Sequence, residues 1–138
     1  MNFEHFKFKI PVHIRWSDMD ELGHVNNAIY ATFYEEGRSH FLSSECQWNW
    51  AIDGIILAKL SMEFKRPLRV DDVCHQYVRV LKIGTKSFEL EYLISRKSAD
   101  DKEEIAAHAQ SVLVMYDYKT HSSIEIPTRL RERLKATL

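Results

Sequence analysis

Hydrophobic and polar residues alternate along much of the chain, and this pattern predicts a protein rich in β-strands. In residues 6–16 apolar side chains occupy every second position and charged side chains lie between them, which is typical of a strand with one buried face. Pro11 lies inside this run. Because proline has no backbone N–H to donate, we expect the strand at a sheet edge or at a bulge. Similar runs predict strands at residues 56–65, 73–83, 87–96 and 105–118.

One long segment changes to the period of a helix. From residue 29 to about residue 44 the apolar positions recur at helical spacing; they are Ile29, Tyr30, Phe33, Tyr34, Gly37 and Phe41. Asn26 or Asn27 is well placed to cap the start of this helix. Gly37 in its middle costs roughly 1 kcal/mol relative to Ala, so we expect another element to pack closely against it.

The order of these segments predicts an α+β fold. Gly84, Thr85 and Lys86 form a tight turn between two strands, and short connections of this kind favour antiparallel pairing. At the C-terminal end Pro127 suits the first position of a short helix, whose apolar stripe is Leu130, Leu134 and Leu138. We therefore expect an antiparallel sheet of five strands, or more, wrapped around one long central helix, followed by a short C-terminal helix.

The composition limits the class of protein further. The 138 residues suit one domain, spanning residues 1–138. A formal net charge of -1 gives no pull toward nucleic acid or an anionic membrane. The chain contains no run of apolar residues close to the roughly 18 needed to span a membrane, and its N-terminus does not have the pattern of a secretory signal. With only Cys46 and Cys74, free thiols in a reducing compartment are expected, and so a cytoplasmic protein.

The segment between the first strand and the long helix carries the candidate chemistry. It places Asp18, Asp20 and Gly23 shortly before a helix N-terminus, where free backbone N–H groups can stabilise a developing negative charge. A carboxylate beside such donors is a plausible hydrolytic site. The spacing alone equally fits an ordinary polar loop in which the aspartates cap turns.

The same segment resembles the opening signature of the 4-hydroxybenzoyl-CoA thioesterase-like family of hotdog proteins. The matching positions are Asp18, Asp20, Gly23, His24, Val25, Asn26, Asn27 and Tyr30, followed by Phe33, Glu35, Glu36 and Arg38. Further along, Phe64 and Pro67, the pair Asp71 and Asp72, and Ile126 before Pro127 also match, so the resemblance spans nearly the whole chain. It implies a hotdog fold, in agreement with the predicted order of elements.

The resemblance implies hydrolysis of an acyl-CoA thioester to a free acid and CoA. In the family the second aspartate of the Asp-x-Asp pair is catalytic, which here is Asp20, acting either as a nucleophile or as a general base for water. Asn27 would supply the backbone N–H that holds the oxyanion. His24 is a further candidate, to position water or to contact the substrate, although many relatives have an apolar residue there. We expect a hydrogen-bonding role for Asp18 and a backbone role for Gly23.

Other sites and cofactors find no support in the sequence. No G-x-S-x-G motif indicates a serine hydrolase, and the histidines and cysteines lack zinc-ligand spacing, so we expect neither a metal nor a cofactor. Cys46 is expected to be an inert thiol. Trp48 and Trp50 are expected in the core, although they could also line an acyl pocket together with Leu57 and Met62.

The expected partners follow from the resemblance. A CoA substrate carries phosphates, which Arg66, Arg96 and Lys97 at strand ends could contact, unless they are simply solvated. Hotdog relatives pair into dimers with the active site at the subunit boundary, and often into tetramers, so a homodimer or homotetramer is expected. Two alternatives remain open: an acyl-carrier-protein thioesterase, and a hotdog module that binds acyl-CoA without hydrolysing it or serves only in assembly.

Overall fold

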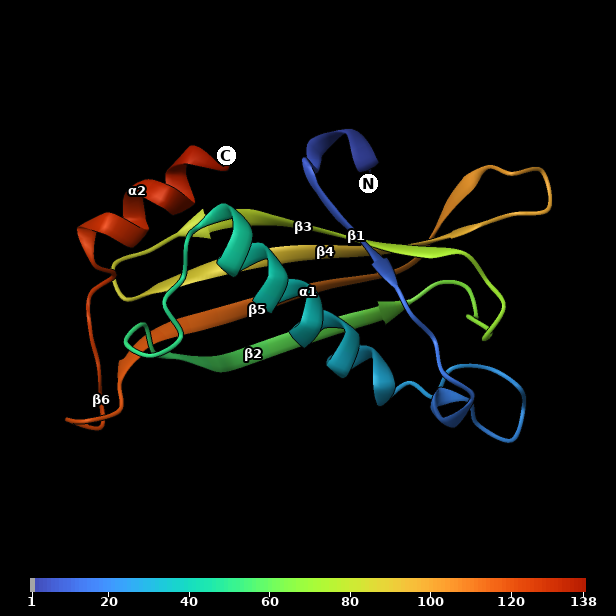
Figure 1. Cartoon of the computed structure of the whole chain (residues 1–138), viewed down its shortest axis with the longest axis horizontal. Helices are drawn as coiled ribbons and strands as arrows, with labels where there is room; N and C mark the ends of the chain where they lie inside the picture. The colour runs from blue at the N-terminus through green and yellow to red at the C-terminus, as the bar shows by residue number, and fades with distance from the viewer. Residues whose placement is uncertain (1) are drawn as a thin grey trace.

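A computed structural model describes residues 2–138 and shows one long helix lying across an antiparallel sheet (Figure 1). The helical elements are the 3₁₀ turns η1 (Phe3–His5) and η2 (Trp16–Asp18), the long helix α1 (Ile29–Glu45) and the short helix α2 (Thr128–Ala136). The strands are β1 (Phe8–Val12), β2 (Ile55–Phe64), β3 (Cys74–Ile83), β4 (Ser87–Lys97), β5 (Glu103–Asp117) and β6 (Ser122–Ser123).

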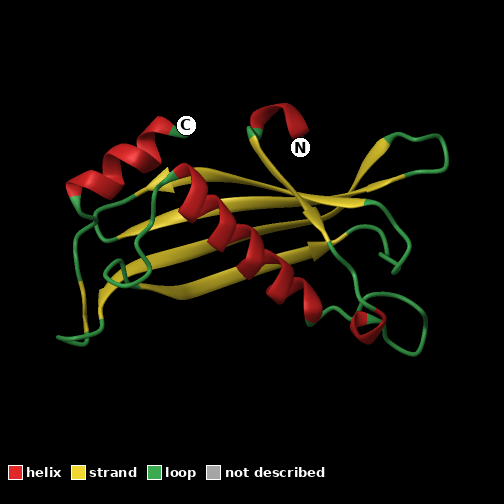
Figure 2. Cartoon of the chain, in the orientation of Figure 1, coloured by secondary structure: helices red, strands yellow, loops and turns green. Residues whose placement is uncertain are grey.

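The strands form a single sheet in which neighbouring strands run antiparallel. Their order is β1-β3-β4-β5-β2, and the short β6 pairs with the end of β5. The tight turn between β3 and β4 forms as predicted, with the N–H of Gly84 donating to the carbonyl of Ser87 at 2.7 Å. β1 and β2 are thus the two edge strands, and the predicted edge position of the strand that contains Pro11 is confirmed. The hotdog arrangement expected from the sequence is confirmed as well (Figure 2).

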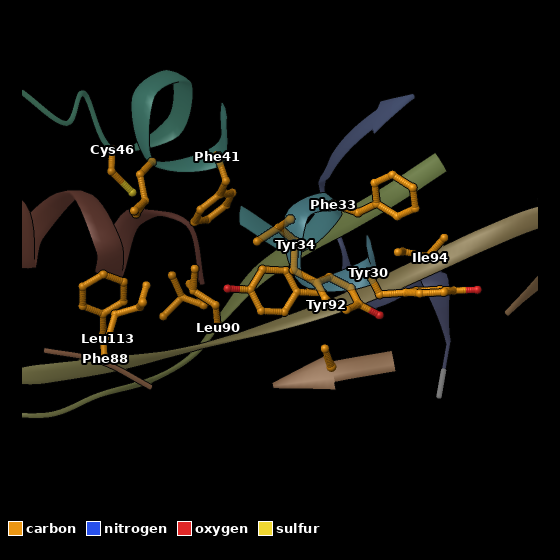
Figure 3. Close-up of a cluster of buried hydrophobic side chains, with 14 of the residues drawn as sticks. Tyr30, Phe33, Tyr34, Phe41, Cys46, Phe88, Leu90, Tyr92, Ile94 and Leu113 are labelled. Carbon is orange, nitrogen blue, oxygen red and sulfur yellow. The ribbon is translucent and has the colours of Figure 1, made fainter. Parts of the chain in front are cut away.

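The core lies between α1 and the inner face of the sheet. Figure 3 shows aromatic residues of α1 meeting those of β4, and the rings of Tyr34 and Tyr92 have centroids 5.0 Å apart. Both residues are fully buried, as are Phe88 and Leu90. Burying side chains of this size contributes roughly 1.5–3 kcal/mol each, so this contact holds the helix on the sheet.

Gly37 lies at a close approach between α1 and β3. A Cβ atom at this position would collide with the side-chain amide of Gln76, whose Nε2 donates to the carbonyl of Phe33 at 2.8 Å. The close packing predicted from a glycine inside a helix is therefore confirmed, and a buried glutamine is its cause.

Several predicted boundaries change in the structure. The first strand spans only residues 8–12 of the predicted 6–16, because the chain turns into η2 before the loop that precedes α1. Leu130 and Leu134 are buried as expected, but Leu138 is 63% exposed because α2 ends at Ala136, so its inclusion in the apolar stripe was wrong. The side chain of Asn26, rather than that of Asn27, accepts the N–H of Ala28 at the start of α1. No helix in residues 2–138 is long and apolar enough to cross a membrane.

Candidate active site

The loop before α1 is closed into a small hairpin that presents Asp20. Met19 and Val25 form an isolated antiparallel bridge, and within it the N–H of Asp20 donates to the carbonyl of His24 at 2.7 Å. Gly23 turns the chain with φ +79°, a conformation that residues with a side chain rarely adopt. A Cβ atom added at this position would meet no atom within 4 Å, so glycine is needed for its backbone conformation and not for space.

The Asp20 carboxylate is anchored through one oxygen only. Its Oδ1 accepts the N–H groups of Leu22 at 2.9 Å and His24 at 3.2 Å. Its Oδ2 accepts no hydrogen bond from any of residues 2–138. This geometry fixes the carboxylate and leaves one oxygen available to a substrate or a water molecule.

Asp20, His24 and Asn27, the three residues predicted for the site, line the same cavity of about 250 Å³. At its edge α1 begins, and the N–H groups of Ala28, Ile29 and Tyr30 are already occupied by the Asn26 side chain, the Asn26 carbonyl and the Asn27 carbonyl. The N–H of Asn27 itself has no acceptor among the described residues. A free carboxylate oxygen and a free backbone donor therefore share one cavity.

Asp18 lies apart from this cavity and has a supporting role. It is 1% exposed, and it accepts the backbone N–H of Arg15 at 2.9 Å and the guanidinium of Arg15 at 3.0 Å. Burial alone would raise the pKa of this carboxyl, but the hydrogen bonds and the charge of Arg15 outweigh burial and lower the pKa below its ordinary value. Its carbonyl also accepts the N–H of Asn26, so Asp18 ties both ends of the loop together.

One wall of the cavity is aromatic and non-ionised. The rings of Tyr30 and Phe64 meet edge to face with centroids 4.9 Å apart, which joins α1 to the end of β2. Burial raises the pKa of Tyr30 to about 12, so its phenol stays protonated near neutral pH. Burial also raises the pKa of each thiol, Cys46 and Cys74, to about 12, and neither is a thiolate nucleophile.

Cations gather on the rim of the cavity, but only one of those predicted lines it. Arg66 lines the cavity beside Lys65, and its Nε lies 3.5 Å from Glu104. Arg96 shares the same Glu104 oxygen and donates to the carbonyl of Pro67. Lys97 instead pairs with Asp101 in a turn, away from the cavity.

The predicted acyl-pocket tryptophans lie beyond the other end of α1. Trp48 is buried and donates to the carbonyl of Asp53, while Trp50 is half exposed and donates to Ser43. Neither lines the cavity that contains Asp20.

Sequence reasoning missed Arg69, whose Nη2 lies 3.2 Å from Nε2 of His24. Its position follows from the packing of two separate loops, for which the sequence gives no local signal. Lys65, which lines the cavity, was missed as well, since it reads as one more polar position in an alternating strand.

The described part of the chain contains no group of three His, Cys, Asp or Glu side chains that could hold a metal ion. The chemistry available in the cavity is thus that of a carboxylate, an imidazole and backbone N–H groups.

Comparison with protein families and curated proteins agrees with this geometry. Residues 14–134 match the family model described as "Thioesterase-like superfamily". The chain is 24% identical over 127 residues to the long-chain acyl-CoA thioesterase FadM of Escherichia coli, covering 90% of this chain and 94% of FadM. It is also 25% identical over 129 residues to the chloroplastic acyl-acyl carrier protein thioesterase ATL3 of Arabidopsis thaliana, covering 91% of this chain and 66% of that protein.

Solved structures share the same architecture. A thioesterase from Thermus thermophilus, complexed with coenzyme A and Zn, superposes with a TM-score of 0.84 at 27% identity, covering 97% of this chain and 96% of that chain. A mutant 4-hydroxybenzoyl CoA thioesterase complexed with 4-hydroxybenzoyl CoA has a TM-score of 0.86, covering 92% of this chain and 97% of its own. At 17% identity the latter supports the fold alone.

Proposed function

Since the chain belongs to the thioesterase-like superfamily, whose members include thioester hydrolases, we propose that it hydrolyses acyl-CoA thioesters at the cavity lined by Asp20, His24 and Asn27. The products are the free acid and CoA. The observation that carries the proposal is the pairing, in one cavity, of an anchored carboxylate that has a free oxygen with an unoccupied backbone N–H.

Asp20 drives the attack on the thioester carbonyl carbon in either of two ways. As a general base, its free Oδ2 takes a proton from water while the water oxygen bonds to the carbon. As a nucleophile, Oδ2 itself bonds to the carbon, the C–S bond breaks to release the CoA thiolate, and water then hydrolyses the mixed anhydride. Both routes need an ionised Asp20 with one oxygen unobstructed, and the free Oδ2 supports this requirement.

Asn27 supplies the donor for the oxyanion. When the carbonyl carbon becomes tetrahedral, negative charge develops on its oxygen, and a donor already in place stabilises that charge without reorganising. The free N–H of Asn27 lies at the start of α1, where the helix dipole adds a favourable potential. This role belongs to the backbone and does not depend on the asparagine side chain.

CoA is the favoured carrier of the acyl group. The curated relative that covers most of its own length, FadM, is an acyl-CoA thioesterase, and the Thermus thermophilus thioesterase was crystallised with coenzyme A. The similarity to ATL3 supports an acyl-carrier-protein thioesterase as the second candidate. The cationic rim of Lys65 and Arg66 suits the phosphates of CoA.

The experiment is a measurement of free thiol released from matched substrates. Purified protein is incubated with butyryl-, benzoyl-, 4-hydroxybenzoyl- and palmitoyl-CoA, and with the same acyl groups on acyl carrier protein. Release of CoA at a higher kcat/KM than release of the carrier protein supports the proposal. Faster hydrolysis of the carrier-protein esters favours the second candidate, and no release from either class contradicts both.

The protein functions as a homodimer or a larger homo-oligomer paired through β2. This strand is ten residues long, lies at a sheet edge, and exposes Ile56, Leu57 and Phe64 by about two-fifths each. An open apolar edge of this length invites pairing with another strand, whereas the opposite edge, β1, has five residues and is interrupted by Pro11. Because Phe64 also lines the cavity, a second copy at β2 would complete one wall of the site.

A further inference from the structure

A contact at the cavity edge determines the protonation of His24. The Nη2 of Arg69 lies 3.2 Å from the Nε2 of His24. A guanidinium is always charged and can only donate hydrogen bonds, so Nε2 must be the acceptor and carry a lone pair. A histidine that accepts at Nε2 is neutral and keeps its single ring proton on Nδ1.

Two backbone connections hold Arg69 and His24 in register. The N–H of Val25 donates to the carbonyl of Leu68 at 2.8 Å, which joins the residues that follow His24 and precede Arg69. The N–H of Arg69 donates to Oδ2 of Asp72 at 2.8 Å, and the N–H of Asp72 returns to the carbonyl of Arg69 at 3.1 Å. Arg69 therefore projects from a closed turn that is fixed to the loop before α1.

His24 is equally fixed relative to Asp20. Its carbonyl accepts the N–H of Asp20 at 2.7 Å, and its own N–H donates to Oδ1 of Asp20 at 3.2 Å. With Nε2 occupied by Arg69, Nδ1 is the remaining polar atom of the ring, and it has no partner among residues 2–138. The ring lines the same cavity as Asp20 and Asn27.

We propose that Arg69 is a positioning residue that holds His24 as the neutral Nδ1–H tautomer, so that His24 donates a second hydrogen bond to the thioester oxygen beside the N–H of Asn27. The inference rests on the proposed function and adds the substrate-contacting atom of His24. The hydrogen bond strengthens as charge develops on the oxygen, and no proton is transferred. Without Arg69 the ring proton distributes between the two nitrogens, and only part of the enzyme presents the donor.

Arg69 also has an alternative use that the test must separate. Its guanidinium forms none of the ion pairs found among the described residues, and it lies next to the cavity rim. A direct contact with a CoA phosphate would make it a binding residue. That role predicts a raised KM for CoA esters and no effect on the tautomer of His24.

The tautomer is measured directly by ¹⁵N NMR on protein labelled at histidine, at pH 7.5, with the His24 signals assigned from their loss in His24→Asn. We expect the Nδ1–H tautomer in the wild type and in Arg69→Lys, and a mixture of tautomers in Arg69→Gln. Arg66→Gln removes a neighbouring charge without touching His24 and is expected to leave the tautomer unchanged. An Nε2–H tautomer in the wild type, or no change in a folded Arg69→Gln protein, overturns the proposal.

Kinetics provide the second readout. The amide nitrogen of asparagine reaches the place of Nδ1 and that of glutamine the place of Nε2, so His24→Asn should retain more activity than His24→Gln. Losing the donor in His24→Ala should lower kcat by about 10²-fold, and loss of its fixed tautomer in Arg69→Gln by about tenfold with KM little changed. Arg69→Gln should have no further effect in the His24→Ala background.

Additive effects of the two changes, or a raised KM with unchanged kcat in Arg69→Gln, contradict the proposal. The outcome is separable from that of the proposed function, because the tautomer is observed without substrate. If no thioester is hydrolysed, the proposed function fails whatever the tautomer. If turnover depends on Asp20 but the Arg69 variants leave the tautomer unchanged, only this inference fails.

Discussion

Asp18 and Asp20 are two residues apart, yet their surroundings give them different tasks. Every carboxylate oxygen of Asp18 is bonded to Arg15 in a buried position, whereas Asp20 keeps Oδ2 free in an open cavity. A buried, charge-paired carboxylate costs a great deal to disturb, so Asp18 supports the loop and Asp20 is left for the chemistry.

Gly23 provides a test of how precisely this loop must be held. Gly23→Ala forces a side chain into a left-handed conformation at a cost of about 1–2 kcal/mol, and we expect it to lower kcat while leaving the core intact. Gly23→Asn is the matched variant, because asparagine tolerates positive φ, and it should retain more activity. Thermal unfolding and thiol release are measured on both. Equal losses in the two variants would show that φ is not what Gly23 provides.

At the scale of elements, the contact of α1 with β3 depends on the missing side chain at position 37. Gly37→Ala places a methyl group against the buried Gln76, and we expect destabilisation of about 1–3 kcal/mol despite the better helix propensity of alanine. Urea unfolding measures the change, with the exposed helix position Glu36→Ala as the control. Combining Gly37→Ala with Gln76→Ala should show strong coupling, since removing the Gln76 side chain makes room for the new methyl group. Additive effects would contradict this account.

The outer face of the sheet carries a buried ion cluster that links three strands. Glu91 on β4 accepts from Arg79 of β3 at 2.6 Å and lies 3.0 Å from His108 of β5. Burial alone would raise the pKa of Glu91, but the bonds to His108 and Arg79 outweigh burial and lower the pKa below its ordinary value of 4.5. Since the folded state holds the ionised form more strongly, this stabilisation is fully present above about pH 4.5 and is lost as the pH falls through the folded pKa.

Glu91→Gln should therefore reduce the free energy of unfolding at pH 7 by about 1.5–3 kcal/mol, and by less as the pH falls below 4.5. Urea unfolding at a series of pH values measures the difference from the wild type. Glu89→Gln, on the same strand but in none of the ion pairs found in residues 2–138, should show little effect at any pH. A penalty for Glu91→Gln that does not depend on pH would contradict the assigned cause.

At the scale of the whole molecule, the two sheet edges are unequal, and this difference predicts the mode of assembly. A charge on an edge strand opposes pairing, so Leu57→Lys on β2 should convert a dimer into monomers. Sedimentation velocity over a range of concentrations measures the change. Val73→Lys, an exposed apolar position outside the strands, is the control and should leave the oligomer intact. A wild type that stays monomeric, or a dimer that is unaffected by Leu57→Lys, would contradict pairing through β2.

The period of the hydrophobic pattern was sufficient to predict most of the fold. It predicted α1 and the long strands to within one or two residues, because each of these elements buries one continuous face. It overextended the strand at residues 6–16, since the alternation continues where the chain has already left the sheet. The apolar spacing that ends at Leu138 likewise says nothing about where α2 ends.

The site was predicted as far as it is local in sequence. Asp20, His24 and Asn27 lie in one loop, and the structure places them in one cavity. Arg69 and Lys65 reach the same region from a different part of the chain, and only the tertiary fold brings them there. The free N–H of Asn27 also depends on which atoms cap α1, which no residue pattern specifies.

The most direct test of the central claim is the thiol released from the preferred acyl-CoA by the wild type and by Asp20→Asn. The substitution keeps the size of the side chain but removes the charge that either role of Asp20 requires, so kcat should fall by about 10²-fold or more with the fold unchanged. Asp71→Asn, at an exposed carboxylate that contacts no side chain in residues 2–138, is the control and should match the wild type. Turnover by a folded Asp20→Asn protein equal to that of the wild type would contradict the account.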